Sequence, residues 1–297
     1  MDLDHTSEPF TVARALAAGR TRGDLRSPDL VAPTRGARVG VAQHAVDPRA
    51  AFLGSLEELA RDDQFFSHVT AARIHGMPLP ARLDDEPIHL ASPSFTSRMR
   101  RDGVVGHRIK ATVVEVAGHR VESIPDAFVH LGTSSLTLDE LVEVGDWIVS
   151  RRRERRLTPT DLREHARHFT GARGIARVHK AIPLVRVGSD SPGETRTRLL
   201  LRRAGLPEPV LQHQVRDGRA RVIATLDLAY PQLLVGMEYD GAYHRLDAEQ
   251  FGYDIRRSAA LDALGWRIIR ISHADIVDGG QRILPLIRAA RSRSIGQ

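Results

Sequence analysis

The chain has 297 residues, of which 41% are hydrophobic, and it contains no cysteine. This length predicts two domains or three small ones, with enough apolar residues to form buried cores. The absence of cysteine excludes disulfides and thiolate metal sites, and no apolar run approaches the roughly 18 residues of a membrane span. The N-terminus lacks the basic start and apolar middle of a secretion signal, so we expect a cytoplasmic protein without a membrane partner.

The net charge is +6 and the isoelectric point is about 10.3. The basic residues are nearly all arginine, since Lys110 and Lys180 are the only lysines. Arginine forks match phosphate oxygens in bidentate fashion, which favours a nucleic-acid partner. Arginine-rich codon usage would give the same composition, and composition alone does not separate the two explanations.

The first predicted segment, residues 1–48, has the outline of a winged helix. A short amphipathic helix is expected at 10–18 and a second short helix after it. A turn and a short strand follow at 35–39, where Arg35 and Arg38 are candidate nucleic-acid contacts. A small helical cap on the next segment is the alternative interpretation.

The second predicted segment, residues 49–187, has the pattern of a mixed α/β domain. We expect helices at 52–59, 66–76, 136–152 and 159–168, and strands at 88–91, 104–109 and 112–116.

The third predicted segment, residues 188–297, alternates helices and strands as in an α/β sandwich with a mixed sheet. We expect helices at 192–204, 251–264 and 281–291, and strands at 222–230, 233–239 and 266–271. The chain as a whole is therefore assigned to the mixed α/β (α+β) class.

Acidic residues interrupt the two apolar strands of the third segment. Asp227 lies inside the strand 222–230, and Glu238 and Asp240 end the next strand. A carboxylate inside a strand is costly to bury unless something compensates it. A tight hairpin would place Asp227 opposite Gly236, so that these acids share one face of the sheet. A slip of one residue would destroy this arrangement.

Two carboxylates on one buried face repel unless a cation or a proton lies between them. Oxygen ligands without cysteine favour Mg²⁺ or Mn²⁺. Such an ion activates water and neutralises charge on a scissile phosphate. Asp227 and Glu238 are therefore the candidate metal ligands, and DNA is the expected partner.

Other candidate residues have plain structural explanations as well. Glu194 follows Ser191 by three residues, a capping box that explains it without function. Asp240 begins a turn dipeptide, and His244 is either a surface or supporting histidine, or else a general base or a phosphate contact. Arg256 and Arg257 form either a solvated helix face or a phosphate-binding border of the site.

Taken in order, these residues resemble the PD-(D/E)XK nuclease superfamily, and within it the Vsr-like (very short patch repair) and domain-of-unknown-function 559 groups, over residues 190–272. The resemblance implies that Asp227 and Glu238 bind the metal directly, with the Tyr239 carbonyl as a third ligand. It implies that Glu194 binds the metal through water or orients the ligands around it, and that His244 lies near the scissile phosphate. The wider superfamily has lysine where this chain has Asp240, a position that the Vsr-like branch also leaves without lysine.

The first two segments resemble the AbiEi-type antitoxins of type IV toxin–antitoxin systems. The matching stretches are residues 10–19, 35–39 and 67–80. The resemblance implies an N-terminal winged helix that represses by binding DNA, and it leaves open a toxin-like partner protein.

These patterns predict a Mg²⁺- or Mn²⁺-dependent DNA endonuclease whose catalytic residues are Glu194, Asp227, Glu238, Asp240 and His244. The alternative is a non-catalytic DNA-binding regulator, or an antitoxin-like protein, that keeps a nuclease fold. The sequence does not indicate the oligomeric state.

Overall fold

The structure is a computed structural model that describes residues 8–93, 95–153, 157–240 and 248–295, with the backbone alone described at 248–254 and 291–295. It divides into two compact units. Unit 1 comprises Met1–Gly76 and Pro80–His130, and unit 2 comprises Met77–Leu79 and Leu131–Gln297. The finer boundaries expected after residues 48 and 187 stay predictions. Within the described part of the chain, no helix is both long enough and apolar enough to cross a membrane.

Unit 1 begins with a small antiparallel sheet of strand order β1-β3-β2. Its elements are β1 (Phe10–Thr11), α1 (Val12–Ala17), a 3-10 helix (Asp24–Arg26), β2 (Leu30–Val31), β3 (Ala37–Gly40), α2 (Val41–Val46) and α3 (Pro48–Leu59). Helix α1 begins where the Thr11 hydroxyl accepts a hydrogen bond from the Arg14 N–H (3.1 Å). The expected first helix and strand are confirmed, whereas the expected second helix is only a 3-10 turn.

A second, mixed sheet of order β6-β5-β4-β8-β7 forms the rest of unit 1. Its elements are β4 (Phe65–Phe66), α4 (His68–Ile74), a 3-10 helix (Ala81–Leu83), β5 (Ile88–Ser92), β6 (Val104–Arg108), β7 (Val113–Val116), β8 (His119–Glu122) and α5 (Ile124–Leu131). The three expected strands are confirmed. Strand β8 was not predicted, because the turn before it is Ala117-Gly118, with both residues at positive φ, rather than a typical Asn-Gly pair.

Unit 2 begins with helices that support its sheet. They are α6 (Leu138–Val149), α7 (Pro159–Arg167), α8 (Ile175–Ala181), a 3-10 helix (Ile182–Leu184) and α9 (Pro192–Arg203). Thr137 with Glu140 and Thr158 with Asp161 form capping boxes that fix the starts of α6 and α7. The expected helices at 136–152, 159–168 and 192–204 are confirmed to within a few residues.

The sheet of unit 2 has the order β12-β11-β10-β9, with β11 and β12 parallel and the other pairs antiparallel. Its elements are β9 (Val210–Arg216), β10 (Val222–Tyr230), a 3-10 helix (Pro231–Leu233), β11 (Val235–Tyr239), α10 (Ala248–Ala263), β12 (Arg267–Ile271), α11 (His273–Val277) and α12 (Ile283–Ile295). The mixed α/β class and the mixed sheet are thus confirmed.

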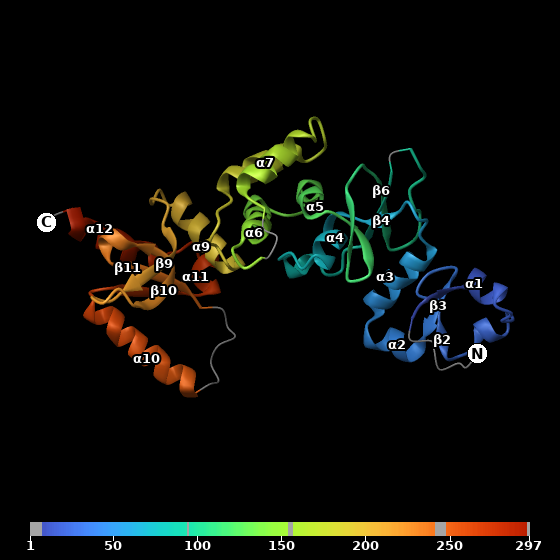
Figure 1. Cartoon of the computed structure of the whole chain (residues 1–297), viewed down its shortest axis with the longest axis horizontal. Helices are drawn as coiled ribbons and strands as arrows, with labels where there is room; N and C mark the ends of the chain where they lie inside the picture. Colours follow the sequence, from blue (N-terminus) through green and yellow to red (C-terminus); the bar gives the residue numbers. More distant parts are fainter. Residues whose placement is uncertain (1–7, 94, 154–156, 241–247, 296–297) are drawn as a thin grey trace. The chain divides into compact units, whose positions relative to one another are not determined.

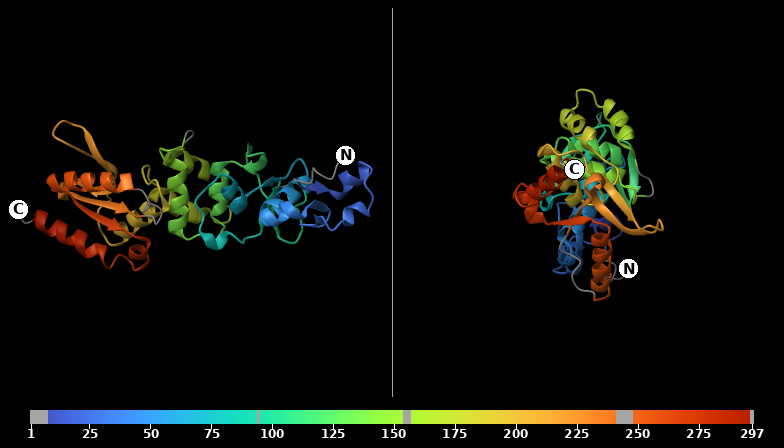
Figure 2. Two further views of the ribbon diagram at one scale, coloured as in Figure 1. Left: turned by 90° about the horizontal axis from the view of Figure 1, so that it is seen from below. Right: turned by 90° about the vertical axis from the view of Figure 1, so that its left-hand side faces the viewer.

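Helices cover both faces of this sheet. Helices α10 and α12 lie on opposite faces (Figures 1 and 2). One core lies between the sheet and the helices α9 and α12 and contains Leu200, Met237, Ile269, Ile283 and Ile287. The other lies against α10 and contains Leu226, Leu261 and Trp266. The sandwich holds Asp227, inside β10, and Glu238, near the end of β11, close to helix α9.

The hairpin register of β10 and β11 differs from the expected one. Gly236 pairs with Ala229, not with Asp227. The connection is longer than a two-residue turn, because a 3-10 helix at Pro231–Leu233 is followed by Leu234 at φ 50°. The observed pairing is shifted by two residues from the expected one. Because two is an even number, side-chain alternation still places Asp227 and Glu238 on one face of the sheet.

Candidate functional site

Helix α9 places Glu194 at the edge of the sheet. The Ser191 hydroxyl accepts a hydrogen bond from the Glu194 N–H (3.2 Å) and donates one to Glu194 Oε1 (2.9 Å). The other oxygen, Oε2, accepts from the Asp190 N–H (2.8 Å) and from Gln212 Nε2 (3.1 Å). Glu194 therefore caps its own helix and also contacts strand β9, so the cap is only part of its role.

Asp227 approaches Glu194 from strand β10. Its Oδ2 accepts a hydrogen bond from the Tyr239 N–H (3.0 Å). Burial raises the pKa of Asp227, and the neighbouring Glu238 raises it further. Burial also raises the pKa of Glu194 to about 7, and the charge of Asp227 is the next cause. The carboxylate of Asp227 is thus close enough to disfavour ionisation of Glu194.

Glu238 forms an ion pair with Arg257. Arg257 on α10 donates Nη1–H to Glu238 Oε2 (3.2 Å) and Nη2–H to Oε1. Arg257 Nη2 also approaches the Thr225 carbonyl at 3.4 Å. Both oxygens of Glu238 therefore face a guanidinium group, and Arg257, expected to contact nucleic acid, is held by a carboxylate.

The expected direct metal ligands are Asp227, Glu238 and the Tyr239 carbonyl, with Glu194 binding through water or orienting these ligands. Glu194 is buried and Asp227 is half-buried, and burial and neighbouring carboxylates raise the pKa of both, so a divalent cation beside them would favour their ionised forms. Glu238 would join them only by exchanging Arg257. The ligand atoms of Glu194, Asp227 and Glu238 do not all lie within 4.8 Å of one another. Among the described residues, the groups of three whose ligand atoms do lie this close together are in unit 1.

The remaining expected catalytic residues differ in their surroundings. Tyr239 offers its N–H to Asp227, and its side chain is half-buried. Asp240 is exposed, and its N–H donates to the Ile271 carbonyl (2.8 Å) at the end of the sheet. His244 lies outside the described residues.

The other candidate nucleic-acid contacts divide into two kinds. Arg38 is half-buried and donates to the carbonyls of Leu25 (2.9 Å) and Ala37 (2.8 Å), so its charge supports the small sheet. Arg35 and Arg256 are exposed, and within the described part of the chain their side chains have no hydrogen bond or ion pair. They are the two that could reach a phosphate without breaking a contact.

A pocket of about 340 Å³ opens beside Glu238. Four arginines contribute to its lining, which includes Arg257, Arg267, Arg270 and Arg282. Arg282 is paired with Asp275, whereas Arg267 and Arg270 are exposed residues on opposite faces of β12. The acidic residues thus adjoin a basic hollow of the kind that accepts phosphate groups.

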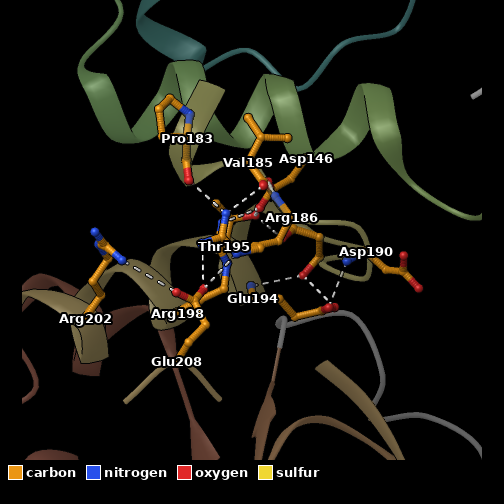
Figure 3. A network of polar contacts seen from close by, with 11 residues as sticks. Asp146, Pro183, Val185, Arg186, Asp190, Glu194, Thr195, Arg198, Arg202 and Glu208 are labelled. Atoms are coloured by element: carbon orange, nitrogen blue, oxygen red, sulfur yellow. Dashed lines mark hydrogen bonds and ion pairs between the residues drawn. The ribbon is translucent and has the colours of Figure 1, made fainter. Parts of the chain in front are cut away.

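A buried ion pair fastens α9 to α6 behind the site (Figure 3). Arg198 is fully buried and donates Nη2–H to Asp146 Oδ2 (2.8 Å) and Nη1–H to Glu208 Oε1 (3.0 Å). Asp146 also accepts from the Thr195 hydroxyl (2.8 Å) and the Arg186 N–H (2.7 Å). This network fixes the first turns of α9, and with them the position of Glu194.

Sequence analysis missed a histidine cluster in unit 1, formed by His68, His89, His107 and His130. Burial, reinforced by the neighbouring histidines, lowers the pKa of His68 to about 2 and that of His107 to about 4. Their imidazoles are therefore neutral near pH 7. The available signal was one histidine in each of four apolar stretches, which does not reveal that the stretches meet.

Together the fold and site define a mixed α/β protein with a buried acid cluster beside a basic pocket. The chain is 24% identical to two uncharacterized proteins of Mycobacterium tuberculosis, one from strain CDC 1551 / Oshkosh and one from strain ATCC 25618 / H37Rv. Each match spans 207 residues, which is 70% of this chain and 73% of the relative. No family model matches the chain, and no solved structure matches it either.

Proposed function

We propose that unit 2 is a metal-dependent DNA endonuclease and that the N-terminal part of unit 1 helps to bind DNA. The observation that carries the proposal is the meeting of Glu194 and Asp227. Glu194 is buried and Asp227 is half-buried, the two come from different elements, and the charge of Asp227 raises the pKa of Glu194. A structural capping residue alone would not require a second carboxylate beside it.

The residues divide the chemistry among them. Glu194 and Asp227 would hold Mg²⁺ or Mn²⁺, and Glu238 would complete the ligand set once Arg257 turns to the DNA phosphate. When bound, the cation supplies Lewis-acid stabilisation of charge that develops at the scissile phosphate. Arg267 and Arg270 would bind the backbone of the DNA in the basic pocket.

The proton-handling residue differs from the usual lysine of the superfamily. Asp240 occupies that position, and an acid there does not supply a positive charge. We assign the proton transfer to His244, whose imidazole changes charge near neutral pH.

The test is cleavage of DNA by the purified full chain. Supercoiled, nicked, mismatched and single-stranded DNA are incubated with Mg²⁺, with Mn²⁺ and with a chelator. The proposal predicts cleavage that requires the metal, that falls by at least about 100-fold in Asp227→Asn, and that persists in Asp62→Asn. Asp62 is an exposed aspartate of unit 1 and serves as the matched control. Cleavage by Asp227→Asn at the wild-type rate would refute the assignment.

A second candidate function is favoured by the Glu238–Arg257 pair. Arg257 satisfies Glu238 without a metal, as expected of a nuclease fold kept only for DNA binding. This DNA-binding regulator, or antitoxin-like protein with a protein partner, predicts salt-sensitive DNA binding that needs no divalent cation. Binding that requires Mg²⁺ and is lost in Glu238→Ala would argue against it. The nuclease and the DNA-binding regulator both need access to DNA. We therefore propose that the protein is cytoplasmic.

A further inference from the structure

Four histidines of unit 1 meet although they come from four different elements. His68 begins α4, His89 lies on β5, His107 on β6 and His130 in α5. Their ring centroids are 3.8 Å apart for His68 and His107, 5.0 Å for His89 and His107, and 5.0 Å for His68 and His130. Imidazoles are polar, and gathering four of them in a mostly buried place is unfavourable without a compensating role.

The backbone at His68 is held in a conformation that side-chain-bearing residues seldom adopt. Its φ is +51°, in the left-handed region. The buried Glu122 stabilises this conformation, because its Oε1 accepts the His68 N–H (2.5 Å) while its Oε2 contacts His130 Nδ1 (2.6 Å). Strain of this kind is retained where the surrounding structure fixes a side chain for a purpose.

The ligand nitrogens of His68, His89 and His107 all lie within 4.8 Å of one another. His89 Nδ1 is 2.9 Å from His107 Nε2, because the two residues occupy the same face of neighbouring parallel strands, where Ala91 pairs with His107. Strands β5 and β6 thus place two nitrogens next to each other, and α4 brings a third close to them.

The outer nitrogens of two of these histidines have partners of their own. His89 Nε2 is 3.5 Å from Glu86 Oε2, and His68 Nδ1 is 3.0 Å from the Ser67 hydroxyl. A carboxylate behind a histidine, on the side away from the ion, is the common supporting arrangement at metal sites. These contacts leave His89 Nδ1 and His68 Nε2 as the ligand atoms.

We propose that His68, His89 and His107 bind one divalent transition-metal ion, with Zn²⁺ as the best fit. Three imidazoles with a fourth position left for water are a common zinc ligand set. His89 and His107 are only half-buried, so that position is reachable from solvent. Zinc–nitrogen bonds of about 2.0–2.1 Å place tetrahedral ligands about 3.3–3.4 Å apart. Binding therefore replaces the His89–His107 hydrogen bond, widens the distance between these two nitrogens by a few tenths of an ångström, and turns the nearly parallel rings about their Cβ–Cγ bonds so that their in-plane lone pairs face the ion.

A second three-residue set, His68 with Glu122 and His130, is less suitable. All three residues are buried, and both oxygens of Glu122 already accept or share hydrogen bonds with His68 and His130. We assign Glu122 and His130 to positioning His68. The zinc site is independent of the proposed nuclease: it lies in unit 1 and uses nitrogen ligands, whereas Mg²⁺ prefers oxygen.

The test is a calorimetric titration of the chelator-treated full chain with Zn²⁺. The proposal predicts one Zn²⁺ site in the wild-type chain. Removing a supporting hydrogen bond typically lowers metal affinity roughly tenfold, and His107→Gln, which removes a ligand, should lower the Zn²⁺ affinity far more than that. Glu86→Gln should weaken it by roughly tenfold. His44→Gln, a half-buried histidine of unit 1 outside the cluster, should leave it unchanged. Equal Zn²⁺ affinity in wild type and His107→Gln would overturn the proposal.

A measurement on the wild-type chain covers the case in which a variant fails to fold. X-ray absorption of the zinc-loaded protein should show a first shell dominated by three imidazole nitrogens. A shell of oxygen ligands alone, or no stoichiometric zinc, would overturn the proposal. Excess Mg²⁺ should not displace the zinc from the histidine site. If the chain binds zinc there but does not cleave DNA, the nuclease proposal fails and the zinc proposal stands.

Discussion

The charge of Asp227 raises the pKa of Glu194, although the two residues are 33 positions apart and belong to a strand and a helix. With burial as the larger cause, the pKa of Glu194 reaches about 7 against an ordinary 4.5. Between about pH 4.5 and pH 7, Glu194 holds a proton in the folded chain that it has released in the unfolded chain. The free energy of unfolding therefore falls as pH rises through this window, by on the order of 3 kcal/mol in total.

Glu194→Gln should remove this part of the pH dependence. Both tryptophans, Trp147 and Trp266, lie in unit 2, so their fluorescence follows its unfolding in urea. We expect the variant to gain stability relative to wild type at about pH 8 more than at about pH 5. Glu164→Gln, an exposed acid of α7, should match wild type at both. The interpretation fails if the Glu194 variant keeps the wild-type pH slope.

Arg257 and a divalent cation compete for Glu238. Arg257→Gln removes the bidentate partner and leaves both Glu238 oxygens available. We expect Mg²⁺ to bind this variant more tightly than wild type, as measured by calorimetry, because the cation no longer has to displace a guanidinium group. Arg256→Gln, an exposed neighbour on the same helix, should bind as wild type does. Weaker Mg²⁺ binding by Arg257→Gln would show that Arg257 supports the site instead.

The buried pair of Arg198 and Asp146 fixes helix α9. Arg198→Met leaves Asp146 buried without its charge partner, and such a loss typically costs about 3–5 kcal/mol. Arg203→Met breaks the exposed ion pair with Asp139 and should cost less than about 1 kcal/mol. Urea unfolding followed by tryptophan fluorescence measures both. Similar losses in the two variants would contradict the role given to the buried pair.

Gly193 provides the space that Tyr239 needs at the start of α9. A Cβ at Gly193 would lie 2.2 Å from Tyr239 Cε1, closer than two atoms can approach. Gly193→Ala should therefore displace the ring or the helix and cost about 1–3 kcal/mol. Gly218→Ala meets no atom within 4 Å and serves as the control. A Gly193→Ala chain as stable as the control would contradict this packing argument.

The sequence predicted three of the four strands in the sheet of unit 2, missing β9, and it predicted that Asp227 and Glu238 share one face, because these features follow from local patterns. A carboxylate within an apolar strand marked Asp227, and alternation linked it with Glu238 despite an error in the hairpin register. That register depended on Leu234 adopting a left-handed conformation, which a leucine does not signal.

Contacts between residues far apart in the sequence could not be predicted. Nothing local indicates that Arg257 pairs with Glu238, 19 residues earlier, or that Arg198 reaches Asp146, 52 residues earlier. The histidine cluster likewise depends on four elements whose mutual placement is set by the tertiary fold. Strands, helices and single marked residues were readable, whereas the contacts between elements were not.

The central claim is that Glu194 and Asp227 form a cation site. Calorimetric titration of Mg²⁺ at about pH 8, which is above the pKa of about 7 for Glu194, tests it most directly. The account predicts one Mg²⁺ site in the wild-type chain that is retained in Asp62→Asn and lost in Asp227→Asn. Mg²⁺ binding of wild-type strength in Asp227→Asn, or no Mg²⁺ binding to the wild-type chain, would contradict it.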